Sequence, residues 1–301
     1  MNTGYNAIYE QYVIWLNTLG FAKCTVRRYG NGVRDFFIWL ESQNINHISQ
    51  LKTTHITAFY DYQQTRENKK FGGTLSNSYL NDYYTSVDKV LEFLHQMGMD
   101  NAPSPVKRRI IIDQDERIRK IEPFTVEEIK ILQATINDLY PQSNHEHRTK
   151  KQEQLKLIFA LFYGCGLRLS EGYNLTVKEI DFNRRTVFVR QGKNYKDRIV
   201  PMSENVYNVL QNYIYNFRSQ IKCQHNRLFI NNHGILLKDL HHLHSKCQDE
   251  NIKNKRLYFH IMRHSIATHL LQNGMSIENI ARFLGHGTLC STQIYTHIIN
   301  R

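Results

Sequence analysis

The amino-acid sequence predicts a mainly α-helical protein with a small antiparallel β-sheet in its C-terminal part. Apolar residues recur at helical spacing over long stretches, whereas short apolar runs between turn residues replace this periodicity from about residue 175 to 202. The 301 residues are enough for two hydrophobic cores, because domains typically contain about 100 to 200 residues. We expect a helical domain over 1–100, a basic linker over 101–122 and a second domain over 123–301.

Four helices are predicted in the first domain, and their approximate ranges are 5–19, 26–40, 54–66 and 78–96. Because the connections between them are short, neighbouring helices should pack antiparallel as a small bundle. The linker begins after Gly98 and contains Pro103, Pro105 and the basic triplet Lys107, Arg108 and Arg109. This triplet either contacts a phosphate backbone or belongs to a solvated hinge.

The second domain is predicted to open with a capping box at Thr125 and Glu128, followed by an apolar helix over 155–164. Three strands should follow, containing Leu175 and Val177, Val187 and Val189, and Ile199 and Val200. Turns at 181–184 and 191–194 separate them. The remaining helices are expected at about 203–218, 237–248, 258–273 and 276–284.

The formal net charge of +12 and the pI near 9.4 indicate a polyanionic partner, most plausibly nucleic acid, with a merely basic protein as the alternative. The net charge is zero over 1–100, +2 over 101–122 and +10 over 123–301. The first domain should therefore contact DNA through a local patch. The candidates for this patch are Lys23, Arg27, Arg28 and Arg34.

Cysteine usage and hydropathy indicate a protein of the reducing cytoplasm, where its net charge predicts that it acts on DNA. The five cysteines are odd in number and form no Cys-x-x-Cys pair, which argues against a disulfide framework and a zinc ribbon. No apolar run approaches the roughly 20 residues of a membrane span, and the first residues do not form a signal peptide. No membrane association and no metal or other cofactor is expected.

Two arginines have the setting needed to stabilise a phosphodiester under attack, since a guanidinium is always charged and grips two oxygens at once. Arg168 follows a glycine-rich bend at Gly164 and Gly166, although an arginine there could also be an ordinary surface residue. His260 and Arg263 share one side of a helix. His264 with His260 also has zinc spacing, but the metalloprotease pattern requires Glu where Ile261 stands.

Lys193 lies at the predicted hairpin tip, from which it could protonate a leaving oxygen or contact a phosphate. A nucleotide-binding loop is excluded, because Val187 and Asn194 stand where that motif needs glycine and Ser or Thr. His286 follows Gly285 at a helix end, where a phosphate can approach closely. Tyr295, nine residues later, offers a phenol that could act as nucleophile.

Together these residues resemble the tyrosine recombinases, also called the phage integrase family. The similar stretches occur in family order and are Gly166–Glu171, Gly192–Lys193 with Arg198–Pro201, His260–His269, Leu284–His286 and Ile294–His297. The resemblance implies that Tyr295 attacks the scissile phosphate to give a 3′-phosphotyrosyl link. It further implies that Arg168 and Arg263 clamp the phosphate, Lys193 is the general acid, His260 assists proton transfer, His286 holds a phosphate oxygen and Glu171 supports the arginines.

The resemblance also implies a two-domain, C-shaped clamp around double-stranded DNA and a homo-tetramer that joins two DNA sites. The chain looks closest to simple Xer-type and mobile-element recombinases, which act in DNA recombination and integration. Because few residues follow Tyr295, the usual exchange of a C-terminal tail is not expected, and the tetramer should either rely on other surfaces or be weak. The alternatives are type IB topoisomerase-like relaxation of DNA and a non-catalytic DNA-binding accessory protein.

Overall fold

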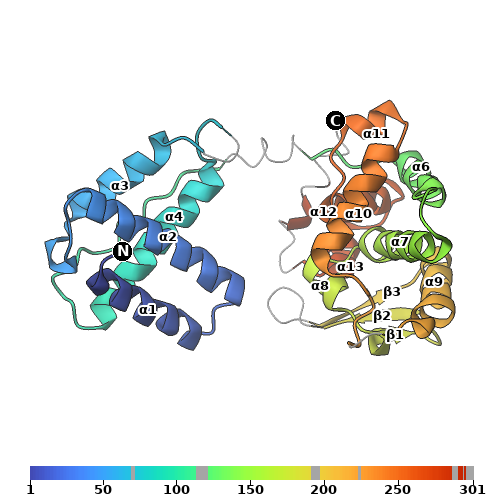
Figure 1. Cartoon of the computed structure of the whole chain (residues 1–301), viewed down its shortest axis with the longest axis horizontal. Helices are drawn as coiled ribbons and strands as arrows, with labels where there is room; N and C mark the ends of the chain where they lie inside the picture. The colour runs from blue at the N-terminus through green and yellow to red at the C-terminus, as the bar shows by residue number, and fades with distance from the viewer. Residues whose placement is uncertain are drawn as a thin grey trace. The chain divides into compact units, whose positions relative to one another are not determined.

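The computed structural model describes residues 1–68, 72–112, 121–190, 197–222, 225–286, 291–293 and 295. The chain divides into two compact units, Met1–Asp113 and Gln114–Arg301 (Figure 1). Helices make up most of both units, and the described part of the second unit contains one three-stranded antiparallel sheet. The predicted fold class, mainly α with a small antiparallel sheet, is confirmed.

The four predicted helices of the first unit are present as α1 Thr3–Thr18, α2 Lys23–Ser42, α3 Thr53–Thr65 and α4 Asn77–Gln96 (Figure 1). Their apolar faces meet in a core rich in aromatic rings, which bury a large area per residue. The α2 and α4 helices approach closely at Gly32, where a Cβ atom would lie 2.5 Å from the Ser86 hydroxyl oxygen. Only a glycine fits there.

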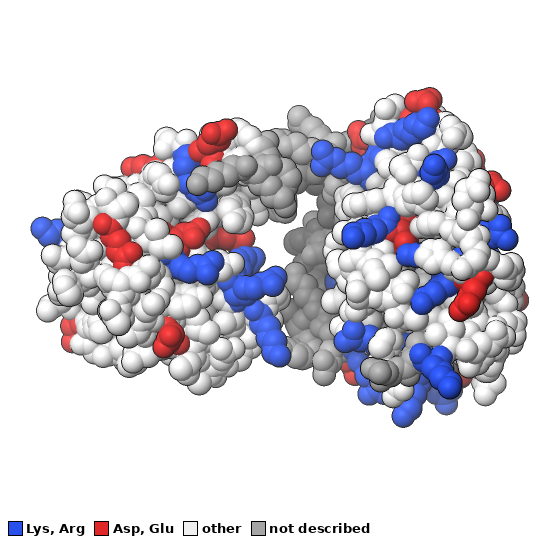
Figure 2. Space-filling model, viewed as in Figure 1, with Lys and Arg blue, Asp and Glu red and all other residues white. Residues whose placement is uncertain are grey.

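The basic residues predicted to bind DNA from this unit all lie on α2 and are exposed: Lys23, Arg27, Arg28 and Arg34. Arg28 forms an ion pair of 3.2 Å with Asp82 of α4. Arg27 and Arg28 also line a cavity of about 320 Å³ together with Tyr79 and Tyr83. Figure 2 shows that the visible basic side chains of this unit gather mainly in one patch, with acidic side chains beside it.

Residues 101–112, which composition assigned to the linker, pack against the first unit. Val106 and Ile110 contact its hydrophobic core. Asn81 of α4 makes two hydrogen bonds of 2.8 Å with the Ile110 backbone, one to the carbonyl and one from the N–H. Composition suggested a linker because prolines and charges dominate, whereas Pro103 and the four residues from Lys107 to Ile110 have polar partners on α3 or α4.

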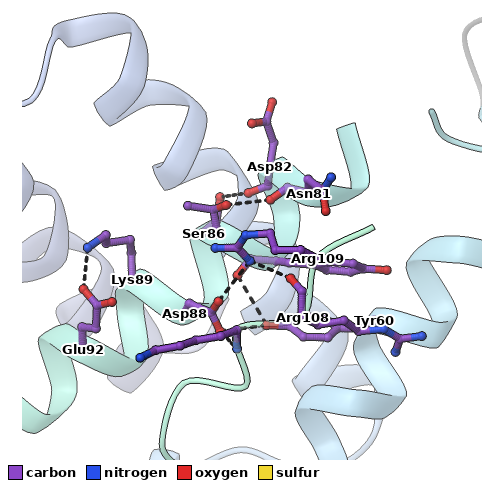
Figure 3. A network of polar contacts seen from close by, with 12 residues as sticks. Tyr60, Asn81, Asp82, Ser86, Asp88, Lys89, Glu92, Arg108 and Arg109 are labelled. Atoms are coloured by element: carbon purple, nitrogen blue, oxygen red, sulfur yellow. Dashed lines mark hydrogen bonds and ion pairs between the residues drawn. The ribbon is translucent and has the colours of Figure 1, made fainter. Parts of the chain in front are cut away.

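Asp88, a buried residue of α4, is the centre of this attachment (Figure 3). Its Oδ1 accepts hydrogen bonds from the Tyr60 hydroxyl at 3.3 Å and from the Lys107 backbone N–H at 3.2 Å. Its Oδ2 lies 3.3 Å from the Arg109 guanidinium, and Arg108 pairs with Asp61 of α3 at 2.8 Å. Two of the three cations of the basic triplet therefore have carboxylate partners within the unit.

In the second unit, the predicted capping box is present at the start of α6. The Thr125 hydroxyl accepts from the Glu128 N–H and the Glu128 carboxylate accepts from the Thr125 N–H. The helices are α6 Val126–Thr135, α7 His145–Ile158, α8 Leu169–Asn174, α9 Glu204–Gln211, α10 His233–Lys246, α11 Glu250–Asn254, α12 Phe259–Gln272 and α13 Ile277–Leu284. The π-helical segments η3 Phe159–Gly164 and η6 Asn212–Phe217 continue α7 and α9.

Short 3₁₀ turns also occur among the described residues, at η1 Ile48–Gln50, η2 Ile136–Asp138, η4 Val177–Glu179 and η7 Arg218–Gln220. The α7 helix starts ten residues before the predicted 155–164 helix, because the Asn144 side chain caps it by accepting from the His147 N–H. Its first turns are charged rather than apolar. Apolar periodicity therefore revealed only the buried half of this helix.

The sheet contains β1 Ile180–Asp181, β2 Thr186–Val189 and β3 Arg198–Pro201, in that order. Val187 pairs with Val200 and Val189 with Arg198, so alternate valines enter the core while Arg198 takes a defined place at the start of β3. The turn predicted at 181–184 is present, with the Arg184 N–H donating to the Asp181 side chain at 2.9 Å.

The first strand was predicted around Leu175 and Val177 and this prediction is wrong, since β1 begins at Ile180. Leu175 follows α8 and its carbonyl accepts from the Leu228 N–H at 2.8 Å. Val177 starts the η4 turn, which Glu179 stabilises by accepting from the Thr176 N–H at 2.7 Å. Leu175 is buried and Val177 is half-buried, although neither belongs to a strand.

We expect Asp88→Ala to lower the free energy of unfolding of the first unit by about 2 to 3 kcal/mol, because it leaves buried donors without an acceptor. Both tryptophans, Trp15 and Trp39, lie in this unit, so urea unfolding followed by tryptophan fluorescence reports on it specifically. Asp61→Ala is the matched control, since its exposed pair with Arg108 should contribute less than about 1 kcal/mol. Equal decreases in the free energy of unfolding for Asp88→Ala and Asp61→Ala would contradict the central role of Asp88.

Candidate active site

Arg168 is positioned by a bend that follows the η3 segment. Gly166 has a φ of +58°, which favours glycine, and a Cβ atom there would lie 2.9 Å from Leu284 of α13. The buried Leu167 anchors the chain, and Arg168 then precedes α8. The sequence interpretation of this bend is confirmed, because the glycine allows the chain to turn directly beneath α13.

The carbonyls at the end of α13 each accept a hydrogen bond from a different arginine. Arg198 Nε donates to the Phe283 carbonyl at 3.1 Å, and Arg263 Nη2 donates to the Leu284 carbonyl at 2.7 Å. Arg168 Nη2 donates to the Gly285 carbonyl at 2.6 Å. The last carbonyls of a helix have no partner within it and carry partial negative charge. The helix end therefore gathers three guanidinium groups in one place.

Glu171 on α8 holds two of these arginines together. Its carboxylate accepts from Arg168 Nη1 at 2.6 Å and from both terminal nitrogens of Arg198, at 2.9 and 2.8 Å. Burial alone would raise the pKa of Glu171, but the hydrogen bonds and charge of Arg198, with those of Arg168, outweigh it and hold the pKa at about 2. The carboxylate is therefore ionised at neutral pH.

Arg263 on α12 is 4% exposed and also donates from Nη1 to the Gly166 carbonyl at 2.6 Å. Burial and the nearby Arg168 lower its pKa to about 10, so it remains protonated at neutral pH. Each guanidinium has five N–H donors, and the hydrogen bonds described above use only some of them. Arg168 and Arg263 can therefore hold an anion while keeping these backbone contacts.

The residue after Gly285 is His286, which the turn at the end of α13 brings to the same place. Gly285 has a φ of +65°, and a Cβ atom there would lie 2.8 Å from the Arg198 side chain. His286 Nδ1 lies 2.7 Å from the Thr292 hydroxyl oxygen. Burial and the charges of Arg263 and Arg168 lower the pKa of His286 to about 3, so its imidazole is neutral.

Tyr295 is 1% exposed and packs against Ala267, Ile280 and Leu284. Its ring also stacks on His286, with centroids 6.3 Å apart, and contacts His264 at 5.6 Å. Burial raises the pKa of Tyr295 to about 12, while Arg263 and Arg168 act in the opposite direction. The phenol is thus covered by apolar side chains but lies within the field of both arginines.

His260 differs from the other histidines of the site because its side chain is exposed on α12. Desolvation, Arg263 and Arg168 together lower its pKa. Lys193, the sixth predicted catalytic residue, lies outside the described residues, as does the turn predicted at 191–194. The structure therefore brings Arg168, Glu171, Arg263, His286 and Tyr295 together, with His260 close enough to share their electrostatic field.

The described residues contain no group of three or more His, Cys, Asp or Glu side chains arranged to hold a metal ion. The described helices also include none with the length and hydropathy needed to cross a membrane. Cys24, Cys165 and Cys247 are unpaired thiols.

Comparison with known families identifies the second unit. The sequence profile of the phage integrase family matches residues 127–301, which is more than half of the chain and contains every residue of the site. The chain belongs to the phage integrase family. The match confirms the resemblance seen in the sequence motifs, and the relatives extend the similarity into the first unit.

Two relatives within the phage integrase family are Xer enzymes. Tyrosine recombinase XerC of Lacticaseibacillus casei is 28% identical over 194 residues, which cover 60% of this chain and 64% of the relative. This match therefore spans slightly less than two thirds of that relative. Tyrosine recombinase XerD of Staphylococcus haemolyticus is 27% identical over 297 residues, covering 97% of this chain and 94% of the relative.

Solved structures of the family share the fold. XerH recombinase, in a post-cleavage complex with a palindromic difH substrate, aligns with a TM-score of 0.69 and 18% identity, covering 91% of this chain and 76% of that one. The Tn1549 transposon integrase, in complex with circular intermediate DNA, aligns with a TM-score of 0.60 and 20% identity, covering 96% and 94%. Because the sequence identities are only 18% and 20%, these alignments establish that the chain shares the fold of the two enzymes.

Two residues of the site had no role assigned from sequence reasoning. Arg198 stands in one of the stretches that resemble the family. Its contacts with Glu171 and the Phe283 carbonyl could not be predicted, because they require β3, α8 and α13 to come together. His264 was considered only as a zinc ligand, whereas its ring lies against Tyr295. For Arg198, a sequence signal did exist, because a charged residue opens the strand that contains the apolar Ile199 and Val200. No comparable signal marked His264.

We expect Glu171 to make the stability of the second unit depend on pH. Its pKa is lowered from 4.5 to about 2 on folding, so its contribution is present in full above pH 4.5 and is lost as the pH falls toward 2. The shift corresponds to roughly 3 kcal/mol. Urea unfolding followed by circular dichroism should show a shallower loss across this window for Glu171→Gln than for wild type.

The control for this measurement is Glu250→Gln, which removes an exposed carboxylate that pairs with Lys253 on α11. Its stability should fall with pH as steeply as that of the wild type. Parallel curves for Glu171→Gln and wild type would show that Glu171 is not the ionised, buried group described here.

Proposed function

We propose that this protein is a site-specific DNA recombinase that cleaves and rejoins DNA strands through a 3′-phosphotyrosyl intermediate. The observation that supports the proposal best is the meeting of Arg168, Arg263 and Tyr295 at the end of α13. Membership of the phage integrase family and similarity to Xer recombinases along almost the whole chain support it as well. Neither topoisomerase-like relaxation nor an accessory role without catalysis gains support from the relatives.

The reaction needs a nucleophile and a charge stabiliser. The Tyr295 oxygen attacks the scissile phosphorus and loses its proton, a new O–P bond forms, and the bond from phosphorus to the 5′ oxygen breaks to give a free 5′-hydroxyl. Arg168 and Arg263 bind the non-bridging oxygens, where negative charge increases in the transition state. The phosphotyrosyl bond conserves the energy of the broken bond, so a second 5′-hydroxyl can reverse the step without nucleotide or metal.

The remaining site residues serve proton transfer and support. Lys193 is the general acid that protonates the leaving 5′ oxygen, and His260 assists removal of the proton from Tyr295. His286, neutral and held by Thr292, donates to a phosphate oxygen. Glu171 supports the arginines by neutralising part of their charge, which limits the repulsion among three adjacent cations.

Double-stranded DNA is the proposed partner, bound by both units. XerH and the Tn1549 integrase were each solved in complex with DNA. Most of the positive charge of this chain lies in its second unit, over 123–301. In the first unit, Lys23, Arg27, Arg28 and Arg34 contact phosphates from α2, and Lys107, Arg108 and Arg109 contact them from the segment packed on α4. Binding should weaken steeply with salt as counterions are released.

The recombinase works as a homo-tetramer on two DNA sites, in the cytoplasm. Strand exchange joins two duplexes, and each duplex needs a cleaving protomer on each strand, so four copies are the smallest symmetric assembly. The similarity to the Tn1549 transposon integrase extends the proposal to enzymes of mobile elements. Each domain has its own function in this proposal. Residues 1–100 bind DNA, and residues 123–301 catalyse strand exchange.

Tyr295→Phe should abolish formation of the covalent protein–DNA adduct, because the variant lacks the attacking oxygen. The target is obtained by isolating DNA that is covalently trapped on the wild-type protein in the source cell and sequencing it. A duplex of that sequence, nicked beside the scissile phosphate, traps the adduct, which is measured by gel electrophoresis in the presence of EDTA. An adduct that persists in Tyr295→Phe, or a strict need for Mg²⁺, would refute the mechanism.

Arg168→Ala and Arg263→Ala should each slow adduct formation roughly 100-fold or more, as expected for the loss of one preorganised group that stabilises developing charge. The rate is measured at saturating protein, so that weaker DNA binding does not contribute. Lys253→Ala is the charge-matched control, since Lys253 pairs with Glu250 on α11 and takes no part in the site. Rates equal to that of the control would exclude the two arginines from catalysis.

A further inference from the structure

The imidazole of His264 lies directly against the proposed nucleophile. His264 follows Arg263 on α12, and its ring centroid is 5.6 Å from that of Tyr295, with the planes inclined at 55°. His286 also stacks nearly parallel to Tyr295, with an angle of 10°. The tyrosine ring is therefore in contact with two imidazoles that come from different elements.

His264 Nδ1 is buried and has no hydrogen-bond partner within the described part of the chain. A buried polar atom left unsatisfied costs about 1 to 3 kcal/mol, so such atoms are uncommon. Neighbouring imidazoles are paired, since His286 Nδ1 lies 2.7 Å from the Thr292 hydroxyl and His269 Nδ1 lies 3.0 Å from the Tyr163 hydroxyl. The unused hydrogen-bonding atom is thus next to the tyrosine that must react.

The surroundings of His264 make it a hydrogen-bond acceptor. Burial, together with the neighbouring His260 and Arg263, lowers its pKa to about 4. A neutral imidazole carries one proton, so one of its nitrogens donates and the other accepts. With the proton on Nε2, the unpartnered Nδ1 offers a lone pair to a hydroxyl group.

We propose that His264 is a positioning residue for Tyr295. The Nδ1 atom of His264 accepts a hydrogen bond from the Tyr295 phenol when the tyrosine engages the scissile phosphate. This hydrogen bond directs a lone pair of the phenolic oxygen toward the phosphorus that Arg168 and Arg263 hold. The inference rests on the proposed recombinase function. It gives His264 a role separate from that of His260: His264 holds the hydroxyl before attack, and as the O–P bond forms the single phenolic proton leaves this hydrogen bond and passes to His260.

Two substitutions separate hydrogen bonding from packing. His264→Asn places a carbonyl oxygen close to the position of Nδ1, whereas His264→Phe keeps an aromatic ring against Tyr295 and removes the acceptor. We expect His264→Phe to slow adduct formation on the nicked duplex roughly 10- to 100-fold, as misplacement of a reacting group does. His264→Asn should stay within a few-fold of wild type. The reverse order, or two rates equal to the wild-type rate, would overturn the inference.

His269→Phe is the matched control for damage to α12. It also removes a buried imidazole from this helix, but its partner is Tyr163. We expect this variant to unfold at a lower temperature and to form the adduct at the wild-type rate. DNA affinity, measured by gel shift, should be unchanged in all His264 variants, because the orienting bond concerns a protein hydroxyl.

A second measurement covers the case in which His264→Phe does not fold. In wild-type protein labelled with ¹⁵N-histidine and bound to the intact duplex, the Nδ1 resonance of His264 should lie upfield of its position in Tyr295→Phe bound to the same duplex. Identical resonances would overturn the inference.

Adduct formation by wild type and by Tyr295→Phe is also measured on the nicked duplex. Absence of a wild-type adduct refutes the recombinase function itself, whereas a normal adduct with an unaffected His264→Phe refutes only the role of His264.

Discussion

Capping of the α13 C-terminus by three arginines is the interaction on which the rest of the site depends. The carbonyls of three successive residues, Phe283 to Gly285, accept from Arg198, Arg263 and Arg168. Three like charges within one small volume would repel one another. The negative end of the helix and the ionised Glu171 offset that repulsion, so the arginines stay charged and fixed before any phosphate arrives.

This arrangement explains the glycines around it. Gly166 and Gly285 both have positive φ, and a Cβ atom at either position would collide with a side chain of the cluster or of α13. The two bends bring the η3, α8 and α13 segments close enough for arginine side chains to reach backbone carbonyls. Local backbone geometry, helix electrostatics and the proposed phosphate clamp are therefore parts of one structure, and a change in any of them should alter the other two.

The sequence allowed prediction of features that depend on local patterns. Spacing of apolar residues predicted α1 to α4, and the Thr125 capping box predicted the start of α6. Features that depend on distant partners were missed. The β1 strand was misplaced because Leu175 and Val177 pack against the core without forming a strand. Residues 101–112 looked like a linker because Asp88 and Asn81, which bind them, are 19 and 29 residues away from their partners in the sequence. Arg198 and His264 belong to the same class, since their partners are known only from the fold.

The covered position of Tyr295 has a consequence for when the protein can act. A phenol stored beneath Ile280 and Leu284, with its pKa raised to about 12, is neither accessible nor ionised. Uncovering it requires energy, and the interaction with a correctly placed duplex is the available source. Because the nucleophile stays covered until such a duplex binds, cleavage of DNA at other sites should be slow.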